Sequence, residues 1–290
     1  MKIKNDVQEI IKNLRHISAI EKQSEIHKQM DGTTEGLVYL INVDESPKYV
    51  LKLDQPDALS LVEQYKKTYP DAPLLPKLTY TAPDKTYIVY TFLKGSTDCI
   101  GCSKEQWLKA LVSGLIQHYI SCSPSQKWGD WLDYPRNTWR EFMEEKADYA
   151  RSYIGDRLPL EDHTLVKSLL MKATMSESQG KFLLHGDCGV HNFIFSHNEL
   201  IGVIDPSPII GPPLYDLLYA FCSSPDDLSI ETLMPAFVML NQSDADQPRL
   251  IEEVIIQLYY RVGICLKHHP HDIDDYLQAW RYWKSLISNE

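Results

Sequence analysis

The stretch "KFLLHGDCGVHNFIF" at residues 181–195 places four polar side chains between two runs of bulky apolar residues. The runs, Phe182–Leu184 and Phe193–Phe195, have the length and composition of short buried strands. Their connection could be a metal site, a catalytic loop or an ordinary turn, and the rest of the sequence decides among the three. The polar side chains are those of His185, Asp187, His191 and Asn192.

A further apolar run follows the quoted stretch and ends at another carboxylate. After the turn "SHNEL", Ile201–Ile204 has the pattern of a third strand, and Asp205 follows it. Asp187 precedes Asn192 by five residues and Asn192 precedes Asp205 by thirteen, so a hairpin would return Asp205 to the side of Asn192. Clustered carboxylates repel each other unless a cation neutralises them. Hard oxygen ligands favour Mg²⁺, which usually also binds substrate phosphates, so the pattern predicts a magnesium and nucleotide site.

The order H-G-D-x4-N followed by I-D resembles the Brenner-type motif of aminoglycoside phosphotransferases and the wider choline-kinase-like group. The resemblance implies that Asp187 orients and deprotonates the acceptor hydroxyl. It implies that Asn192 and Asp205 bind magnesium and that His185 is structural. It also implies that Asp216, in "LYDL", opens the next helix and braces the catalytic loop. No role is expected for the second histidine of the motif.

The first part of the chain has the alternation and turns of a small sheet. Residues 24–53 have the pattern of three short strands, 56–69 that of a helix, and 76–95 that of two more strands. An amphipathic helix is expected to open the chain, because Val7, Ile10, Ile11 and Leu14 recur at helical spacing.

From residue 103 onward the apolar spacing is mainly helical, interrupted by the strands around the quoted stretch. The resemblance implies an α+β, bilobal protein-kinase-like fold. Its smaller lobe, residues 1–95, would hold a five-stranded antiparallel sheet with one main helix and bind the nucleotide. Its larger lobe, residues 96–290, would be mostly helical and hold the catalytic loop and the substrate cleft.

A kinase-like fold needs a lysine on its third strand, because phosphoryl transfer depends on positioning and on neutralising phosphate charge. Lys52 in "KYVLKLD" fits this position, and Glu63, eleven residues later in the predicted helix, is the expected carboxylate partner. The alternative for Glu63 is a solvated surface acid. Gly32 and Gly36 in "MDGTTEGLVY" are the candidates for the nucleotide loop, and ordinary hairpin glycines are the alternative.

The segment "YIVYTFLKG" resembles the last strand and hinge of that fold. The resemblance implies that backbone groups of Thr91 and Leu93 read the adenine and that Tyr90 lies at the back of its pocket. Two features favour a small acceptor over a protein. Gly186 replaces the arginine with which protein kinases sense a phosphorylated activation loop. The connection "DPSPIIGPPLYD" is also short and rich in proline.

Composition limits the class of partner. Lys+Arg number 29 against 40 Asp+Glu, a net charge of −11, which argues against nucleic acid as the partner. An acidic surface could attract a cationic small molecule, although solubility explains it equally well. No run approaches the length of a membrane span, and the first residues lack the apolar core of a signal peptide. Together with six scattered cysteines, expected to be free thiols, this favours a cytoplasmic protein without a membrane partner.

The sequence therefore predicts a kinase that uses ATP, with GTP as the alternative, and Mg²⁺ to phosphorylate a hydroxyl of a small molecule. The acceptor is expected to be aminoglycoside-like, as in antibiotic resistance, or another amine-bearing sugar or alcohol, with cationic molecules among the candidates. Two alternatives remain at this point. One is a metabolic kinase of choline, homoserine or ketosamine type, and the other is a pseudokinase-like binding or scaffold protein. No oligomeric state follows from the sequence.

Overall fold

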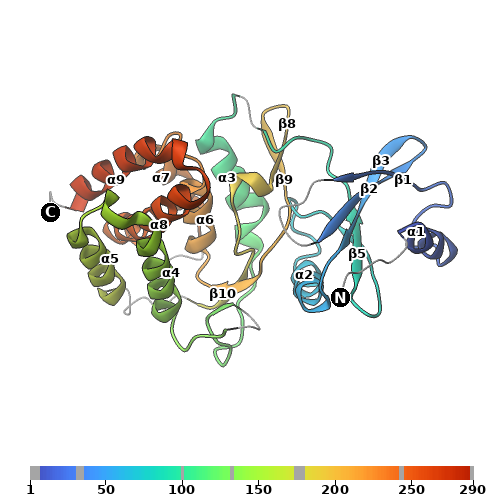
Figure 1. Ribbon diagram of the computed structural model, residues 1–290, viewed down its shortest axis with the longest axis horizontal. Helices are drawn as coiled ribbons and strands as arrows, with labels where there is room; N and C mark the ends of the chain where they lie inside the picture. Colours follow the sequence, from blue (N-terminus) through green and yellow to red (C-terminus); the bar gives the residue numbers. More distant parts are fainter. Residues whose placement is uncertain are drawn as a thin grey trace.

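A five-stranded sheet with two helices forms one end of the molecule, and the remaining helices form the other end (Figure 1). The structure, a computed structural model, describes residues 7–30, 36–98, 101–130, 134–172, 180–241 and 245–287.

The sheet is antiparallel, with strand order β1-β2-β3-β5-β4. β3 pairs with β2 on one side and β5 on the other, so it lies at the centre of the sheet. The predicted five strands with one helix between the third and fourth are confirmed. Their bounds are β1 Glu25–Met30, β2 Leu37–Val43, β3 Ser46–Leu53, β4 Leu78–Thr81 and β5 Tyr87–Thr91.

Two helices pack on this sheet through separate apolar clusters. The predicted opening helix is α1, Val7–His16, and it buries Ile10, Ile11 and Leu14 against one set of strand residues. α2, Pro56–Thr68, begins with a proline, whose fixed backbone angle suits the first position of a helix. Its Leu59 and Val62 pack with residues of β2, β3 and β5 in a different cluster. The central strands therefore have apolar cover from two helices.

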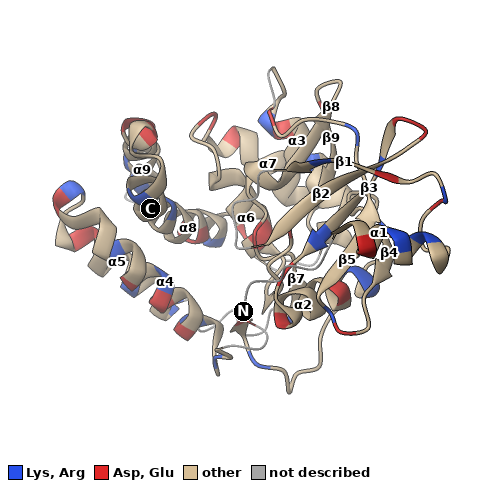
Figure 2. Ribbon diagram, turned by 45° about the vertical axis from the view of Figure 1, so that its right-hand side comes forward, with Lys and Arg blue, Asp and Glu red and all other residues tan. Residues whose placement is uncertain are grey.

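Helices make up most of the remaining chain and share the largest core of the molecule. Ser103 and Thr138 fix the starts of the first two, because their side chains accept hydrogen bonds from backbone N–H groups in the first turn. Both acidic and basic residues occur along α4 and α5 (Figure 2). The helices are α3 Lys104–Gly114, α4 Trp139–Ile154, α5 Leu160–Lys172, α6 Leu214–Cys222, α7 Ile230–Met239, α8 Gln247–His268 and α9 Ile273–Ile287.

Five short strands interrupt the helices and carry the quoted stretch. β8 and β9 form the predicted hairpin, with Phe193 opposite Val203. β7 pairs with β10, which also pairs with β6, and the sequence did not predict β6 and β10, because two or three residues are too few to show a period. The bounds are β6 Gly129–Asp130, β7 Phe182–Leu184, β8 Phe193–Ser196, β9 Glu199–Val203 and β10 Ile209–Gly211.

The two ends of the molecule share part of one core. Tyr65, Tyr69 and Leu74, from the end of α2 and the segment after it, belong to the same apolar cluster as the helices. The Tyr69 hydroxyl also donates a hydrogen bond of 2.6 Å to the Leu183 carbonyl in β7. The end of α2 is thereby held against the strand that enters the candidate site. In the described segments, no helix combines the length and apolar character that crossing a membrane requires.

Candidate active site

A buried aspartate holds the start of the loop that follows β7. Asp216, near the start of α6, accepts hydrogen bonds from the backbone N–H of His185 at 2.8 Å and of Gly186 at 3.1 Å. The Tyr119 hydroxyl donates to the same carboxylate. Burial raises the pKa of Asp216 to about 6, although the hydrogen bonds from Tyr119, Gly186 and His185 lower it. The carboxylate thus fixes two consecutive peptide groups just ahead of Asp187.

The residue between His185 and Asp187 must be a glycine in this geometry. Gly186 has φ +79°, a left-handed conformation that side chains disfavour. A Cβ atom built there would lie 2.0 Å from the Ser207 carbonyl oxygen. The arginine that protein kinases carry at this place therefore has no room, which gives a structural reason for the departure noted in the sequence.

His185 connects the loop to the residue before Asp205. Its Nδ1 accepts the backbone N–H of Asp187 at 3.3 Å, and its Nε2 lies 3.0 Å from the Ile204 carbonyl oxygen. One ring nitrogen must therefore accept and the other donate, which is the pattern of a neutral imidazole. Burial lowers the pKa of His185 to about 4, so the ring stays neutral near pH 7. His185 ties the two halves of the site together without carrying charge.

Asp187 is surrounded by hydrogen-bond donors. The Asn192 Nδ2 atom lies 2.9 Å from its Oδ2 and 3.0 Å from its backbone oxygen. His191 Nε2 is 3.4 Å from Oδ2, and the Tyr219 side chain also hydrogen-bonds the carboxylate. Burial raises the pKa of Asp187, but His191 and Tyr219 outweigh it and lower the pKa to about 2. Asp187 is consequently an ionised carboxylate with a fixed orientation.

The hairpin brings the amide of Asn192 and the carboxylate of Asp205 to one end of its two strands. The backbone N–H of Ile204 donates to the Asn192 carbonyl at 2.9 Å, beside the pairing of β8 with β9. Lys52 Nζ lies 3.1 Å from Asp205 Oδ1, and the Asp205 side chain is 42% exposed. Within the described part of the chain, Asn192 Oδ1 accepts no hydrogen bond.

These two side chains suit a magnesium ion. Asn192 and Asp205 supply hard oxygen donors, and the Asp205 carboxylate already attracts a cation, the Lys52 ammonium. Two protein ligands are what Mg²⁺ needs when phosphates and water complete its coordination. The donor set therefore fits the predicted ion.

The predicted ion pair between Lys52 and Glu63 is wrong. Glu63 lies 2.7 Å from Lys67 Nζ and 2.6 Å from Lys85 Nζ, while Lys52 pairs with Asp205. Residues on a helix are about 100° apart, so the neighbour of an inward-facing residue can face away from the site. Glu63 is buried, and its ion-pair partners are Lys67 and Lys85.

The residue of α2 that interacts electrostatically with Lys52 and Asp205 is Lys66. Its Nζ donates to the Pro76 carbonyl at 3.1 Å and lies 4.8 Å from the centre of the Tyr90 ring. Burial lowers the pKa of Lys66 to about 7, a shift that the charge of Asp205 opposes and that of Lys52 reinforces. The side chain of α2 that interacts electrostatically with Lys52 is thus a lysine, where a carboxylate was expected.

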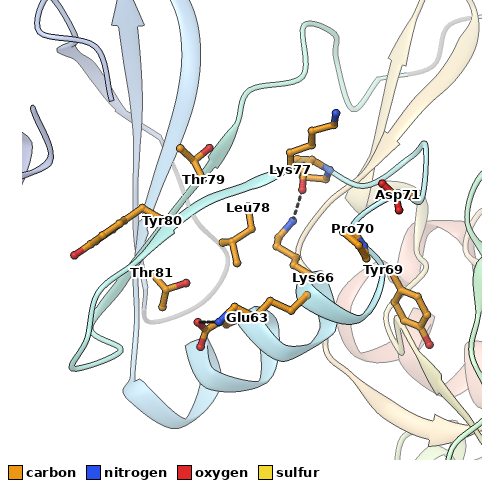
Figure 3. Close-up of a pocket in the computed structure, with 12 residues that line it drawn as sticks. Glu63, Lys66, Tyr69, Pro70, Asp71, Lys77, Leu78, Thr79, Tyr80 and Thr81 are labelled. Carbon is orange, nitrogen blue, oxygen red and sulfur yellow. Dashed lines mark hydrogen bonds and ion pairs between the residues drawn. The ribbon is translucent and has the colours of Figure 1, made fainter. Parts of the chain in front are cut away.

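A cavity of about 670 Å³ is lined by residues of α2, of β4 and of the segment between them (Figure 3). Glu63, Lys66 and Lys77 are among its lining residues. Lys52, Asp187, Asn192 and Asp205 do not line it. This cavity is therefore separate from the group of side chains around Asp187.

The predicted hinge residues follow β5. Tyr90 is buried beneath Lys66, and the Thr91 N–H donates to the Lys77 carbonyl at 3.0 Å. In the described segments, no hydrogen bond engages the backbone N–H of Leu93, so it can donate to a ligand. Gly36 lies just before β2, where an added Cβ would be 2.8 Å from the Leu53 carbonyl. Gly32 falls outside the described residues.

Four residues of the site were not predicted from the sequence. His191 and Tyr219 hydrogen-bond Asp187. Lys66 interacts electrostatically with Lys52 and Asp205, and Lys146 of α4 interacts electrostatically with Asp187. His191 was within reach of prediction, because it lies four residues after Asp187, whereas the others depend on packing between distant elements.

The expectation of six free thiols is wrong for Cys102, which is disulfide-bonded. Cys122, Cys188, Cys222 and Cys265 are free. Cysteine spacing alone does not determine pairing, which is why the sequence could not distinguish these cases.

Comparisons with known proteins agree with this geometry. The family model described as APH, phosphotransferase enzyme family, matches residues 106–252. A search of curated proteins gives no match. The fold is similar to that of aminoglycoside phosphotransferase APH(4)-Ia, with TM-score 0.62, 17% identity, and 97% of this chain and 98% of that chain covered.

Two further solved structures have the same fold. The streptomycin-ATP-APH(2")-IIa ternary complex gives TM-score 0.58 at 17% identity, with 94% of this chain and 93% of that chain covered. The choline kinase LicA from Streptococcus pneumoniae gives TM-score 0.57 at 16% identity, with 96% and 98% covered. The family match spans half of the chain, and these likenesses extend the protein-kinase-like fold over nearly all of it. The chain belongs to the phosphotransferase enzyme family and is a small-molecule kinase.

Proposed function

We propose that the protein transfers the terminal phosphoryl group of ATP, in the presence of Mg²⁺, to a hydroxyl of a small molecule. The observation that carries the proposal is the arrangement around Asp187. An oriented carboxylate, a carboxamide that already contacts it and a second carboxylate paired with a lysine lie on one loop and one hairpin. Phosphoryl transfer needs these groups, because it depends mainly on position and charge.

Asp187 is the residue that receives the acceptor hydroxyl. It is ionised near pH 7, since its pKa is about 2, and Asn192 fixes its orientation. A carboxylate held in this way orients a hydroxyl and accepts its proton as the bond to phosphorus forms. The anchoring of His185 and Gly186 by Asp216 keeps Asp187 in place.

Asn192 and Asp205 are the proposed ligands of the magnesium ion, and Lys52 is the proposed phosphate-binding cation. When bound, the ion would supply neutralisation of phosphate charge. Lys52 lies 3.1 Å from Asp205, so its ammonium is already at the position where phosphates would meet that carboxylate. Lys66 adds positive potential beside it.

Residues 1–95 are proposed to hold the nucleotide, and residues 96–290 the acceptor. The free Leu93 N–H supports adenine binding at the hinge, with Tyr90 behind it, whereas the Thr91 N–H already donates to the Lys77 carbonyl and leaves only the Thr91 carbonyl for the proposed contact. Gly32 and Gly36 are proposed to cover the phosphates. ATP is the preferred donor in this proposal because ATP occurs in a solved complex of similar fold, and GTP is the alternative to be tested.

The connection from Asp205 to Asp216 supports a small acceptor. It contains β10, which pairs with both β6 and β7, so it is built into a sheet. A segment fixed in this way leaves little chain for a switchable activation loop. Related folds occur in a streptomycin-bound phosphotransferase and in a choline kinase, which makes amine-bearing sugars and alcohols the first acceptors to test.

The test is transfer of labelled phosphate from ATP or GTP, with and without Mg²⁺, to aminoglycosides, choline, homoserine and ketosamine sugars. We expect one class to accept phosphate from ATP only with Mg²⁺ and only when Asp187 is intact. Binding of Mg²⁺-ATP without any turnover, including slow hydrolysis, would favour the pseudokinase alternative. Absence of Mg²⁺-dependent nucleotide binding would contradict the proposal.

A further inference from the structure

A lysine of α4 lies among aromatic rings from three helices. Lys146 Nζ is 4.5 Å from the centre of the Tyr260 ring of α8, 4.9 Å from that of Phe142 in α4 and 5.8 Å from that of Tyr215 in α6. The side chain is partly buried. In the described part of the chain, it makes no hydrogen bond and no ion pair within 4.0 Å. Its positive charge is therefore balanced only by ring faces and by more distant carboxylates.

One of those carboxylates is the proposed catalytic group. The charges of Asp130 and Asp187 both act on Lys146, raising a pKa that burial lowers to about 8. The charge of Asp187 also acts on Tyr260, and Tyr219 hydrogen-bonds Asp187 directly. Lys146 lies against the rings of Tyr260 and Tyr215, the Tyr215 ring centre is 5.9 Å from that of Tyr219, and Tyr219 hydrogen-bonds Asp187. Lys146, Tyr219 and Tyr260 consequently form one group of side chains that reaches Asp187 through Tyr219, which we call the lysine–tyrosine cluster.

The side chains of the cluster are partly exposed and include hydrogen-bond donors that have no partner among the described residues. Tyr219 and Tyr260 are both partly exposed, as Lys146 is. Among the described residues, the Tyr260 hydroxyl makes no hydrogen bond. An ammonium carries three donors and a phenol one, so the cluster offers several unpaired donors beside a carboxylate that orients a hydroxyl. Those donors suit a substrate whose own groups can accept hydrogen bonds.

Other cations reinforce the positive charge around this group. Arg261 follows Tyr260 in α8; burial raises the pKa values of Tyr219 and Tyr260, and the charge of Arg261 opposes that rise. Lys267, two turns further along α8, lies 5.0 Å from the ring centres of Tyr149 and Tyr153 in α4.

The arrangement disfavours a cationic acceptor. Rings of this kind attract organic cations through their negative faces. Here the ring faces are already occupied by the Lys146 ammonium, which would repel a second cation. The same ammonium would attract an anion, because charge-assisted hydrogen bonds between an ammonium and a carboxylate or phosphate are strong.

We propose that Lys146 determines acceptor specificity by pairing with an anionic group, a carboxylate or phosphate, on the molecule whose hydroxyl meets Asp187. The inference rests on the proposed phosphotransferase function and narrows its substrate class. It departs from the expectation of a cationic acceptor, because the side chain that lies against the Tyr215 and Tyr260 rings is itself a cation, the Lys146 ammonium.

The test compares three probes that share one skeleton and differ in charge. They are 4-(hydroxymethyl)benzoate, benzyl alcohol and 4-(hydroxymethyl)benzylamine, and their Kd values are measured by calorimetry on protein loaded with AMP-PNP and Mg²⁺. We expect the benzoate to bind at least ~10-fold more tightly than the amine, as expected for a hydrogen bond to a charged group. Lys146→Met should abolish this preference, Lys146→Arg should keep it, and Lys109→Met, a change to an exposed lysine of α3, should leave it unaltered.

Four outcomes would overturn the inference. They are tighter binding of the amine, an unchanged preference in Lys146→Met, loss of the preference in Lys146→Arg with intact nucleotide binding, and no binding of any probe to the loaded protein. The Kd for AMP-PNP is measured in each variant to separate folding defects from specificity. A protein that binds no Mg²⁺-nucleotide would contradict the proposed function itself, whereas normal nucleotide binding without the charge preference would contradict only the role of Lys146.

Discussion

The loop after β7, which carries Asp187, and helix α2 both hold charged side chains near the candidate site, but they hold them in different ways. The backbone of the loop has hydrogen-bond partners within the chain, because the Asp216 carboxylate of α6 accepts the N–H groups of His185 and Gly186. In α2, Lys66 is buried with one carbonyl and one ring as partners, and no carboxylate of the helix pairs with Lys52. The loop is therefore fixed before any ligand binds, whereas the charges beside α2 are balanced only in part.

The largest effect on turnover is expected at Asp187, the proposed proton acceptor in the loop. Asp187→Asn keeps the shape of the side chain but removes the charge and the proton acceptor, so turnover of the best acceptor should fall roughly 10²–10⁴-fold. Steady-state rates with saturating Mg²⁺-ATP measure this effect. An unchanged melting temperature serves as the control for folding, and a rate equal to that of the wild type would remove Asp187 from the mechanism.

A large loss of stability is expected from a single methyl group in the loop. Gly186→Ala places a Cβ 2.0 Å from the Ser207 carbonyl and strains a φ of +79°. Gly101 has nearly the same φ, +80°, with no atom within 4 Å of an added Cβ, so Gly101→Ala is the matched control for backbone strain alone. We expect about 1 kcal/mol for the control and at least ~2 kcal/mol more for Gly186→Ala in urea unfolding. Equal losses would mean that the contact with Ser207 is not restrictive.

Because the charge of Lys66 in α2 is balanced only in part, the free energy of unfolding should depend on pH. The pKa of Lys66 is about 7 in the folded chain against an ordinary value of 10.5, so the unfolded chain binds more protons between these values. The free energy of unfolding should therefore rise with pH through this interval, by about 1 kcal/mol from pH 7 to 8.

Lys66→Met should remove most of that rise, and Lys67→Met, at an exposed neighbour, should not. Burial also lowers the pKa values of Lys104 and Lys146 to about 8, so a smaller rise should remain at the upper end of the interval. Urea unfolding at the two pH values measures the slope. Identical slopes in the wild type and in Lys66→Met would exclude Lys66 as the source.

The smallest effect is expected at Glu63. Because its partners are Lys67 and Lys85 and not Lys52, Glu63→Gln should change kcat by less than about twofold and stability by about 1 kcal/mol or less. Rates and urea unfolding of the purified variant check both values. A loss of activity comparable to that of Lys52→Met would instead place Glu63 in contact with the phosphate-binding lysine during the reaction.

The sequence predicts the loop better than α2 for a physical reason. Asn192 and Asp205 end two adjacent strands, and the two-residue period of a hairpin fixes which residues meet, here Phe193 and Val203. In α2, successive side chains are turned by about 100° around the helix axis. The spacing of apolar residues such as Val62 therefore did not show that Lys66 is also buried.

Contacts between residues that lie far apart in the sequence could not be predicted from it. Lys146 meets Tyr260 across 114 positions, and no local pattern links the two. A lysine on a helix normally extends into solvent, so its place among rings depends on how α4, α6 and α8 pack. The five main strands and most helices, by contrast, followed from periodicity and turn residues, as β1 to β5 illustrate.

The central claim is that Asn192 and Asp205 join Lys52 in one magnesium-dependent nucleotide site. The most direct test is the melting temperature with ATP, with Mg²⁺, and with both, in the wild type and in Asp205→Asn. Bound at a hundredfold excess over its Kd, ATP should raise the wild-type melting temperature by about 5 °C with Mg²⁺. The shift should be much smaller without Mg²⁺ or in Asp205→Asn. An equal shift under all these conditions, or none in the wild type, would contradict the claim.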